Sequence, residues 1–326
     1  MLKNFRYWIH ALGFYISILV QSIYPFLISS FFIYKISKID ILIFFICFLF
    51  SVNLFIVDFE SAIQFIVYVL MILIISQNYT ELKSFLKPFA YLTIIFLIYS
   101  FSLESVNINS GRYWKIMNNG YELNPNFLGL ISGIAFIYFF KYGGRFFSII
   151  PLIFLVICQS RSALLVVLIF LLMSTNIRFK SILSLILFSI IGYLSLLSSG
   201  FMNRIKEDGE NGRFERYLNY WDYYTNYLPL SLSKEQMILL KDNYGNLDNL
   251  YLNLILRFGF GGILILLIIF WKAYNNRISR EKFAMLIALL VHGLFEPSFF
   301  GAYFILSLLA ISISKTERYS KDGSLN

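Results

Sequence analysis

The residues best suited to chemistry lie in one polar stretch, NGRFERYLNYWDYYTNYL, at 211–228. Arginine and tyrosine recur there at i, i+3 and i+4, which would place guanidinium groups and rings on one face of a helix. Arginine binds phosphate oxygens in bidentate fashion, and aromatic rings offer flat faces to sugars. The segment therefore predicts a binding site for a phosphorylated glycan, made of Arg213, Arg216, Tyr217, Tyr220 and Trp221. The alternative is an interfacial aromatic belt with snorkelling arginines.

Two further arginines stand in or beside apolar sequence. Arg161 lies in CQSRSALL, between two apolar segments, and Arg257 lies about two turns into the helix that begins near Asn249. A cation at the edge of a membrane is a candidate functional residue. For each arginine, the alternative is an ordinary ion pair within the protein.

Three titratable residues complete the candidate set. His292 and Glu296, in VHGLFEP, are spaced i, i+4 and would share a helix face, either as a proton relay or as a structural hydrogen-bonded pair. Asp248 lies where the long polar stretch returns to apolar sequence. Its carboxylate could act as general base toward a sugar hydroxyl, or it could cap the following helix.

Sequence motifs for nucleotides, dinucleotides and metals are missing from the chain. It has no Walker-type phosphate loop, no G-x-G-x-x-G, no H-E-x-x-H and no Asp-x-Asp pair. The two cysteines, Cys47 and Cys158, lie in apolar runs and are expected in the core. We therefore expect no metal and no cofactor, and the net charge of +9 does not indicate a nucleic-acid partner.

The elements that must position these residues are predicted to be membrane helices. Of the 326 residues, 59% are hydrophobic and 14% are charged, and the apolar residues form continuous runs without strand-like alternation. Because lipid cannot satisfy backbone groups, each run is predicted to be a helix. The runs lie near 8–34, 41–57, 61–76, 88–103, 125–140, 146–158, 162–175, 181–199, 249–271, 283–295 and 299–314.

Lysine and arginine give the expected orientation. If the segments alternate across the membrane, most basic connections fall on one side, which is the cytoplasm by the positive-inside rule: Lys35, Lys38, Lys83, Lys87, Lys141, Arg145, Arg178, Lys180, Lys272, Arg277, Arg280, Lys282, Lys315, Arg318 and Lys321. Lys3 and Arg6 obey this rule only if QSIYP (21–25) breaks the first segment. The prediction is an all-α polytopic membrane protein of eleven or twelve spans.

The domain organisation follows from these segments. Residues 1–326 form one transmembrane helical domain, with 200–248 as a large extracytoplasmic loop that contains a helix over about 213–227. Gly129 and Gly133 form a small-xxx-small pair, which predicts a close contact between helices.

Four motifs, in order along the chain, carry a family resemblance: NPNFLG (124–129), QSRSAL (159–164), NGRFERYLNYW (211–221) and DNLYLNLILRFGFGG (248–262). The chain in this region resembles the O-antigen polymerase and O-antigen ligase superfamily of bacterial polysaccharide assembly. The resemblance implies transfer of a glycan from undecaprenyl diphosphate to an acceptor sugar at the outer face of the cytoplasmic membrane. Arg161 and Arg213 match the family's arginines that are thought to hold the diphosphate, and Arg216 is a less constrained neighbour. Asp248 stands where ligases carry a histidine base, which favours a polymerase.

The resemblance also implies a location and partners. The protein would be a multi-pass protein of the bacterial inner membrane that binds undecaprenyl-diphosphate-linked oligosaccharide and membrane lipids, with a chain-length regulator and a flippase as candidate partners. Two other functions stay open: an O-antigen ligase-type transferase, and a flippase or exporter of lipid-linked oligosaccharide. A lipid-binding protein whose arginines meet anionic head groups is a further alternative.

Overall fold

The protein is described by a computed structural model that places residues 2–20, 25, 28–29, 38–77, 81–102, 106–107, 114–116, 122–158, 160–174, 211–296 and 303–315. This part of the chain is helical, as predicted. Its first helices are α1 (Leu2–Val20), α3 (Lys38–Val57), α4 (Phe59–Gln77), α5 (Leu82–Ser102), α6 (Pro125–Tyr142), α7 (Ile149–Cys158) and α8 (Arg161–Ser174). The remaining ones are α11 (Asn211–Thr225), α12 (Lys234–Tyr244), α13 (Leu250–Phe258), α14 (Phe260–Asn275), α15 (Arg280–Gly293) and α16 (Tyr303–Ser312).

A small sheet interrupts the helices before α6. Strands β1 (Val106–Asn107), β2 (Trp114–Ile116) and β3 (Glu122–Leu123) pair antiparallel in that order. The sequence had indicated only a long connection at 104–124.

Two described helical stretches are long and apolar enough to cross a membrane: Phe59–Gln77 and Leu82–Tyr99. Five shorter apolar helices have 10–17 residues: Phe5–Val20, Asp40–Leu49, Arg145–Cys158, Arg161–Ser174 and Phe260–Asn275. The predicted segment at 181–199 lies outside the described residues.

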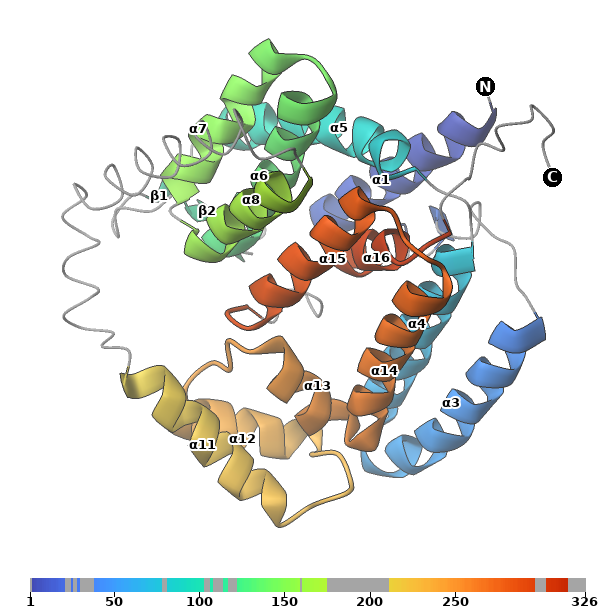
Figure 1. The fold of residues 1–326 in the computed structure, drawn as a ribbon. Coiled ribbons are helices and arrows are strands. Elements are labelled where there is room, and N and C mark those ends of the chain that lie inside the picture. Colours follow the sequence, from blue (N-terminus) through green and yellow to red (C-terminus); the bar gives the residue numbers. More distant parts are fainter. Residues whose placement is uncertain are drawn as a thin grey trace.

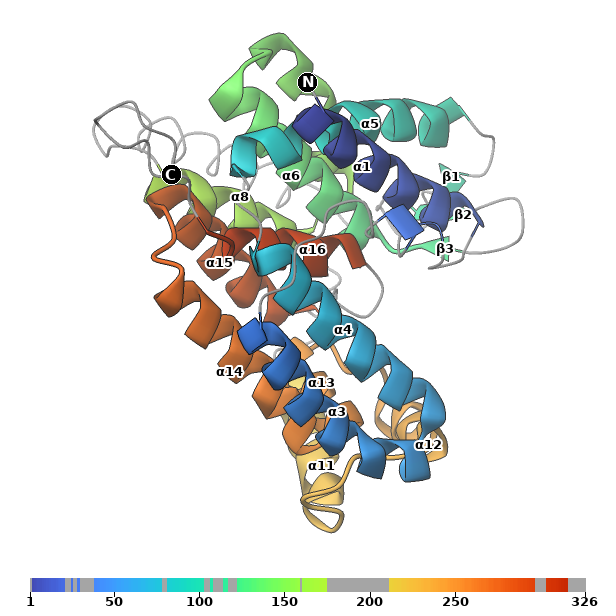
Figure 2. The same cartoon turned by 90° about the vertical axis from the view of Figure 1, so that its right-hand side faces the viewer.

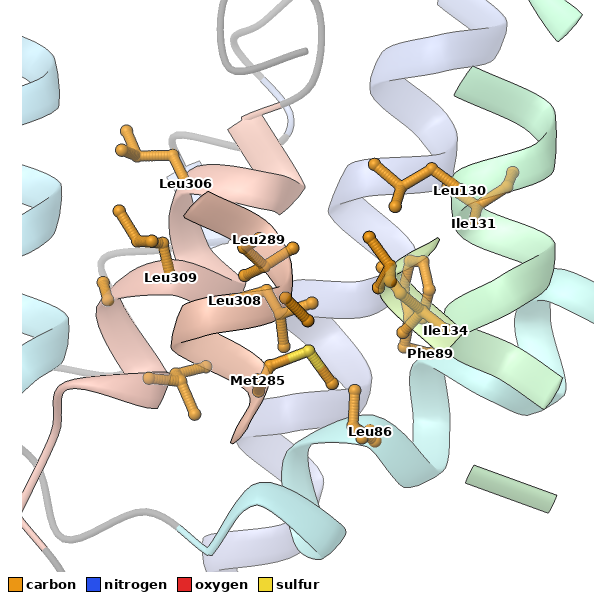
Figure 3. Close-up of a cluster of buried hydrophobic side chains, with 14 of the residues drawn as sticks. Leu86, Phe89, Leu130, Ile131, Ile134, Met285, Leu289, Leu306, Leu308 and Leu309 are labelled. Atoms are coloured by element: carbon orange, nitrogen blue, oxygen red, sulfur yellow. The ribbon is translucent and has the colours of Figure 1, made fainter. Parts of the chain in front are cut away.

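Helix α8 packs against both α6 and α15 (Figure 1). A Cβ added to Gly129 would lie 2.5 Å from Ser160 Cβ, and one added to Gly133 would lie 3.0 Å from Val167 Cγ2. The predicted contact at this glycine pair is therefore confirmed, and α6 runs parallel to α8. Leucine, isoleucine and phenylalanine side chains of α5, α6, α15 and α16 fill the core beside them (Figure 3). Cys47 and Cys158 are buried, as expected.

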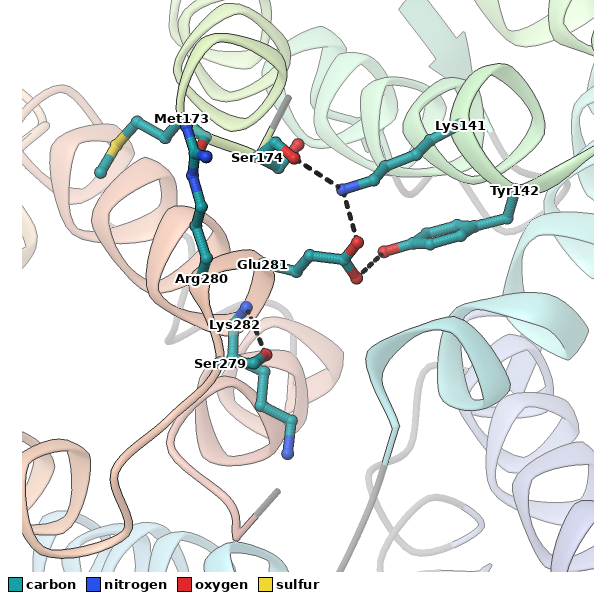
Figure 4. Close-up of polar contacts among 8 residues, drawn as sticks. All are labelled: Lys141, Tyr142, Met173, Ser174, Ser279, Arg280, Glu281 and Lys282. Carbon is teal, nitrogen blue, oxygen red and sulfur yellow. Dashed lines mark hydrogen bonds and ion pairs between the residues drawn. The ribbon is translucent and has the colours of Figure 1, made fainter. Parts of the chain in front are cut away.

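Polar contacts tie one end of this bundle together (Figure 4). Lys141, at the end of α6, forms a 2.8 Å ion pair with Glu281 at the start of α15. Arg280 Nε donates to the Met173 carbonyl at the end of α8, with a 2.6 Å distance. Lys282 Nζ donates to Ser314 Oγ at 2.9 Å, beyond the end of α16. The prediction that these basic connections share one end of the bundle is confirmed for the described residues.

The first predicted segment, 8–34, is not one helix. Helix α1 ends at Val20 and runs parallel to α5, since Tyr7 contacts Phe85 and Tyr15 hydrogen-bonds to Thr93 at 2.5 Å. A Cβ on Gly13 would meet Ser29, so the chain folds back along α1. The start of α1 therefore lies at the basic end, in agreement with the alternative in which QSIYP (21–25) breaks the first segment.

The predicted continuous segment 249–271 is wrong, because the helix breaks at Gly259. That residue adopts φ 55° and ψ −132°, in the region that favours glycine, and separates α13 from α14. A Cβ on Gly262 would lie 2.4 Å from the Leu254 carbonyl oxygen, so α13 folds closely against α14. Figure 2 shows α14 in one layer with α3 and α4.

The polar loop builds a second, smaller core. Helix α11 confirms the helix predicted over 213–227, whereas α12 was not predicted. A capping box between Ser233 and Gln236 begins α12. The buried residues of this outer core come from α11, α12, α13 and the turns between them: Tyr220, Tyr224, Leu232, Leu240, Leu247 and Leu256.

Candidate functional site

Helix α11 docks on the segment that leads into α13, and this contact brings two predicted residues together. Arg216 Nη1 donates to the Asn246 carbonyl at 2.8 Å and lies 3.8 Å from Asp248 Oδ2. The two side chains are 27% and 28% exposed. A pair this open to solvent contributes about 0–1 kcal/mol to stability, but it places a cation beside a carboxylate that solvent can reach.

Two tyrosines of α11 hold the same segment through its main chain. The Tyr217 hydroxyl donates to the Asp248 carbonyl at 3.1 Å, and the Tyr220 hydroxyl donates to the Gly245 carbonyl at 2.8 Å. Burial raises the pKa of the Tyr220 phenol, while nearby Arg216 lowers it and Asp248 raises it. The Tyr220 ring is 1% exposed, so the structure gives this residue a role in holding the segment.

Gly245 adopts a backbone conformation that favours glycine. Its φ of +84° is rarely adopted by other residues, and a Cβ there would lie 3.7 Å from Arg216 Cζ. The glycine thus ends α12 and turns the chain toward Asp248.

Asn249, and not Asp248, caps α13. Its side-chain oxygen accepts from Leu252 N at 3.0 Å, and its Nδ2 donates to the Leu294 carbonyl at 3.4 Å. The N-cap role considered for Asp248 therefore belongs to its neighbour. A Cβ on Gly293 would lie 3.2 Å from Leu250 Cβ, so the start of α13 packs directly against the end of α15.

The other side of the α15 terminus contacts the starts of α6 and α8. His292, which is 1% exposed, lies next to the main chain of Ser162. The Glu296 carboxylate accepts a hydrogen bond from the Asn126 side chain. His292 and Glu296 thus reach different neighbours. Arg161 is the exposed first residue of α8, next to Ser162.

Arg257 lies apart from this group. It occupies the last turn of α13, at the opposite end from Asp248, and its Nη1 donates to Gln64 Oε1 at 3.0 Å. Nearby, Lys234 pairs with Glu60 at 2.8 Å, and that hydrogen bond raises the pKa of the lysine. This region connects α12 and α13 to α4.

The remaining predicted residues lie on α11. Trp221 is 40% exposed, with its ring 5.9 Å from that of Tyr224. Arg213 belongs to α11 one turn before Arg216, and its side chain lies outside the described residues. Arg161 and Arg213 are expected to converge on one outward-facing cavity, since each alone would be a costly cation near lipid, and this stays a prediction.

Sequence reasoning missed Asn126, Ser162 and the turn at Gly245. The N-P-N start of α6 carried a signal, since Asn124 accepts from Asn126 N at 2.8 Å and Pro125 occupies the first helical position. Nothing in the sequence indicated that Asn126 would meet a residue 170 positions away. Within the described ranges, no three His, Cys, Asp or Glu side chains group closely enough to hold a metal ion.

Comparison with protein-family models, curated proteins and solved structures found no match to this chain. The case for a function therefore depends on the residues themselves. Segments 124–129, 160–164 and 245–250, which are distant in sequence, meet around the end of α15, and the segment 211–221 joins them through its contacts with 245–248. Together they offer a carboxylate, two described arginines and an exposed indole.

Proposed function

We propose that the chain is a multi-pass protein of the bacterial cytoplasmic membrane that polymerises undecaprenyl-diphosphate-linked oligosaccharide at the outer face. The membrane part of this proposal is supported by the apolar outer surface of the helices. Soluble proteins rarely expose large contiguous apolar patches. Helix α3 exposes Ile41, Leu42, Phe45, Leu49, Val52 and Ile56, and α14 exposes Phe260, Leu267 and Phe270.

The observation that carries the catalytic proposal is the approach of Arg216 to Asp248, at the end of the bundle opposite the basic connections. An enzyme that transfers sugar from a lipid diphosphate needs a group that accepts a proton from the acceptor hydroxyl. It also needs cations that stabilise the leaving diphosphate. Asp248 and the arginines supply both groups.

In the proposed reaction, an acceptor hydroxyl attacks the anomeric carbon of the donor glycan. The Asp248 carboxylate takes the hydroxyl proton as the new glycosidic bond forms. The bond between the anomeric carbon and the diphosphate oxygen breaks, and its electron pair stays on the diphosphate. Arg161 and Arg213 bind that charge, while Arg216 orients Asp248, and exposed Trp221 stacks against a sugar ring.

A polymerase accounts for these residues better than the two alternatives. A ligase of this superfamily would carry histidine at the position of Asp248. A flippase needs cations along its path, but it does not need a carboxylate beside them. The discriminating test is whether the purified protein lengthens a defined lipid-diphosphate repeat unit without nucleotide.

The role of Asp248 is tested with Asp248→Asn in membranes that contain matched protein levels. The amide keeps the size of the side chain but cannot accept the proton, so chain extension should slow by roughly 10²-fold or more. Asp242→Asn is the matched control, because Asp242 is an exposed carboxylate on α12 of the same outer region. Full activity of Asp248→Asn would remove Asp248 from the mechanism.

The diphosphate site is tested with Arg161→Ala and Arg213→Ala. Each should lower turnover by roughly 10²–10³-fold, the effect of losing one charge-stabilising donor. Lysine should restore activity only in part, because it keeps the charge without the bidentate geometry. Arg145→Ala, an exposed arginine at the basic end, is the control. Full activity in both site variants would contradict the proposal.

A further inference from the structure

The last turn of α15 contacts both halves of the candidate site. On one side, Asn249 donates to the Leu294 carbonyl at 3.4 Å, next to Asp248. On the other side, Glu296 accepts from Asn126, and His292 lies next to the main chain of Ser162, the neighbour of Arg161. Residues 292–296 therefore connect the helix that carries Arg161 to the segment that carries Asp248.

Both partners of the contact between Glu296 and Asn126 are held in place by hydrogen bonds of their own main chain. Glu296 is 9% exposed, and its backbone N donates to the His292 carbonyl at 3.1 Å, which continues the helical pattern past Gly293. Asn126 is fixed by the cap at the start of α6, where its backbone N donates to Asn124 Oδ1 at 2.8 Å. The Glu296 carboxylate also lies at the N-terminus of α6, where negative charge is favoured.

The opposite side of the turn is equally close-packed. Asn249 Oδ1 accepts from Leu252 N at 3.0 Å, so this side chain caps α13 and binds α15 at once. A Cβ added to Gly293 would lie only 2.8 Å from Leu250 Cδ2, so no side chain separates the two elements. A shift of the α15 terminus would move Asp248 relative to the start of α8.

We propose that Glu296 and Asn249 are positioning residues, and that the last turn of α15 sets the separation between Arg161 and Asp248. The inference rests on the proposed function, which gives these two groups their roles. In this proposal Glu296 holds other residues in position and does not accept a proton. Small displacements of reacting groups, on the order of 1 Å, can cost about 10²-fold in rate, so such a device matters for catalysis.

A pair of substitutions at Glu296 separates positioning from chemistry. Glu296→Gln keeps an oxygen that accepts from Asn126 but removes the charge, whereas Glu296→Ala removes the hydrogen bond. Positioning predicts near-normal chain extension for the glutamine variant. For the alanine variant it predicts that kcat falls by about tenfold or more while KM for the lipid-linked donor changes little. If the glutamine variant is as impaired as the alanine variant, or if the alanine variant is fully active, the inference is overturned.

A second measurement needs no enzymatic activity. The ideal Cβ of residue 293 lies 3.2 Å from Leu250 Cβ, close to the roughly 3.5–4.5 Å separation in disulfides. Leu250→Cys with Gly293→Cys, in a full-length chain with Cys47 and Cys158 replaced by alanine, should therefore cross-link under mild oxidation. Adding Glu296→Ala should slow cross-linking, because losing one hydrogen bond, about 1 kcal/mol, raises by about fivefold the population in which residues 250 and 293 are apart. Adding Glu296→Gln should not.

The two readouts distinguish the failure of each proposal. Equal cross-linking rates with and without Glu296→Ala would overturn the positioning role, whether or not the protein extends glycans. Slower cross-linking in a protein that cannot extend any lipid-linked glycan would support the positioning of the turn and reject the polymerase assignment.

Discussion

Two buried tyrosines on α11 should respond in opposite ways to loss of the hydroxyl group. The Tyr220 hydroxyl donates to the Gly245 carbonyl at 2.8 Å, whereas the buried Tyr224 hydroxyl has no hydrogen-bond partner among the described residues. The rings are 1% and 0% exposed and belong to the same core. Phenylalanine preserves both rings, so each substitution isolates one oxygen atom.

The magnitude follows from the fate of each hydroxyl. A neutral hydrogen bond contributes about 1 kcal/mol net, so Tyr220→Phe should destabilise the contact between α11 and Gly245 by about that amount. This corresponds to roughly a fivefold increase in the population in which that contact is open. A buried hydroxyl without a partner costs about 1–3 kcal/mol, so Tyr224→Phe should leave stability unchanged or increase it.

The assay is hydrogen exchange measured by mass spectrometry on the full-length protein, with the peptide covering 245–249 as the readout. Tyr220→Phe should raise exchange there by about fivefold, and Tyr224→Phe should not raise it. Thermal melting of the same samples gives the global effect. Equal destabilisation by the two substitutions would refute the reasoning, because it would mean that the hydrogen bond to Gly245 does not hold the segment.

Two further predictions concern the helix break and the orientation. Gly262→Ala should destabilise the protein by about 1–3 kcal/mol, since the new Cβ would lie 2.4 Å from the Leu254 carbonyl oxygen. Thermal or denaturant unfolding measures this change. A variant as stable as the wild type would show that α13 does not pack on α14 in this way. An impermeant thiol reagent applied to intact cells should label the Asp242→Cys variant, but it should label the Arg277→Cys variant only after lysis. The reason is that these two exposed residues lie at opposite ends of the bundle. The reverse labelling pattern would invert the proposed orientation.

Much of the local structure was determined by the sequence. Continuous apolar runs predicted helices, and helices are what the described residues form, because only local backbone hydrogen bonding satisfies such runs in an apolar setting. The i, i+3, i+4 pattern of arginine and tyrosine predicted α11, and the pair Gly129 and Gly133 predicted a close helix contact. Each of these features depends on residues within one or two helical turns.

The sequence misplaced the boundaries where tertiary contacts override local preference. The run at 249–271 is mostly apolar, yet it breaks at Gly259, where the main chain of Pro229 and Leu230 passes too close for any side chain. Hydropathy is insensitive to such an approach, since the partner segment is thirty residues away in the chain.

For the candidate site, the sequence likewise predicted the residues but not their contacts. Residue types alone nominated Asp248, Arg161, Arg216 and Glu296 as groups capable of chemistry. Only the tertiary structure decided that Arg216 approaches Asp248 at 3.8 Å, that Asn249 is the cap of α13, and that Glu296 binds Asn126. The physical reason is that the contacts of Arg216 and Glu296 join residues 32 and 170 positions apart, and their distances are set by how α6, α11, α13 and α15 pack together. A pattern within one segment fixes which face a residue occupies, but the packing of helices fixes what that face meets.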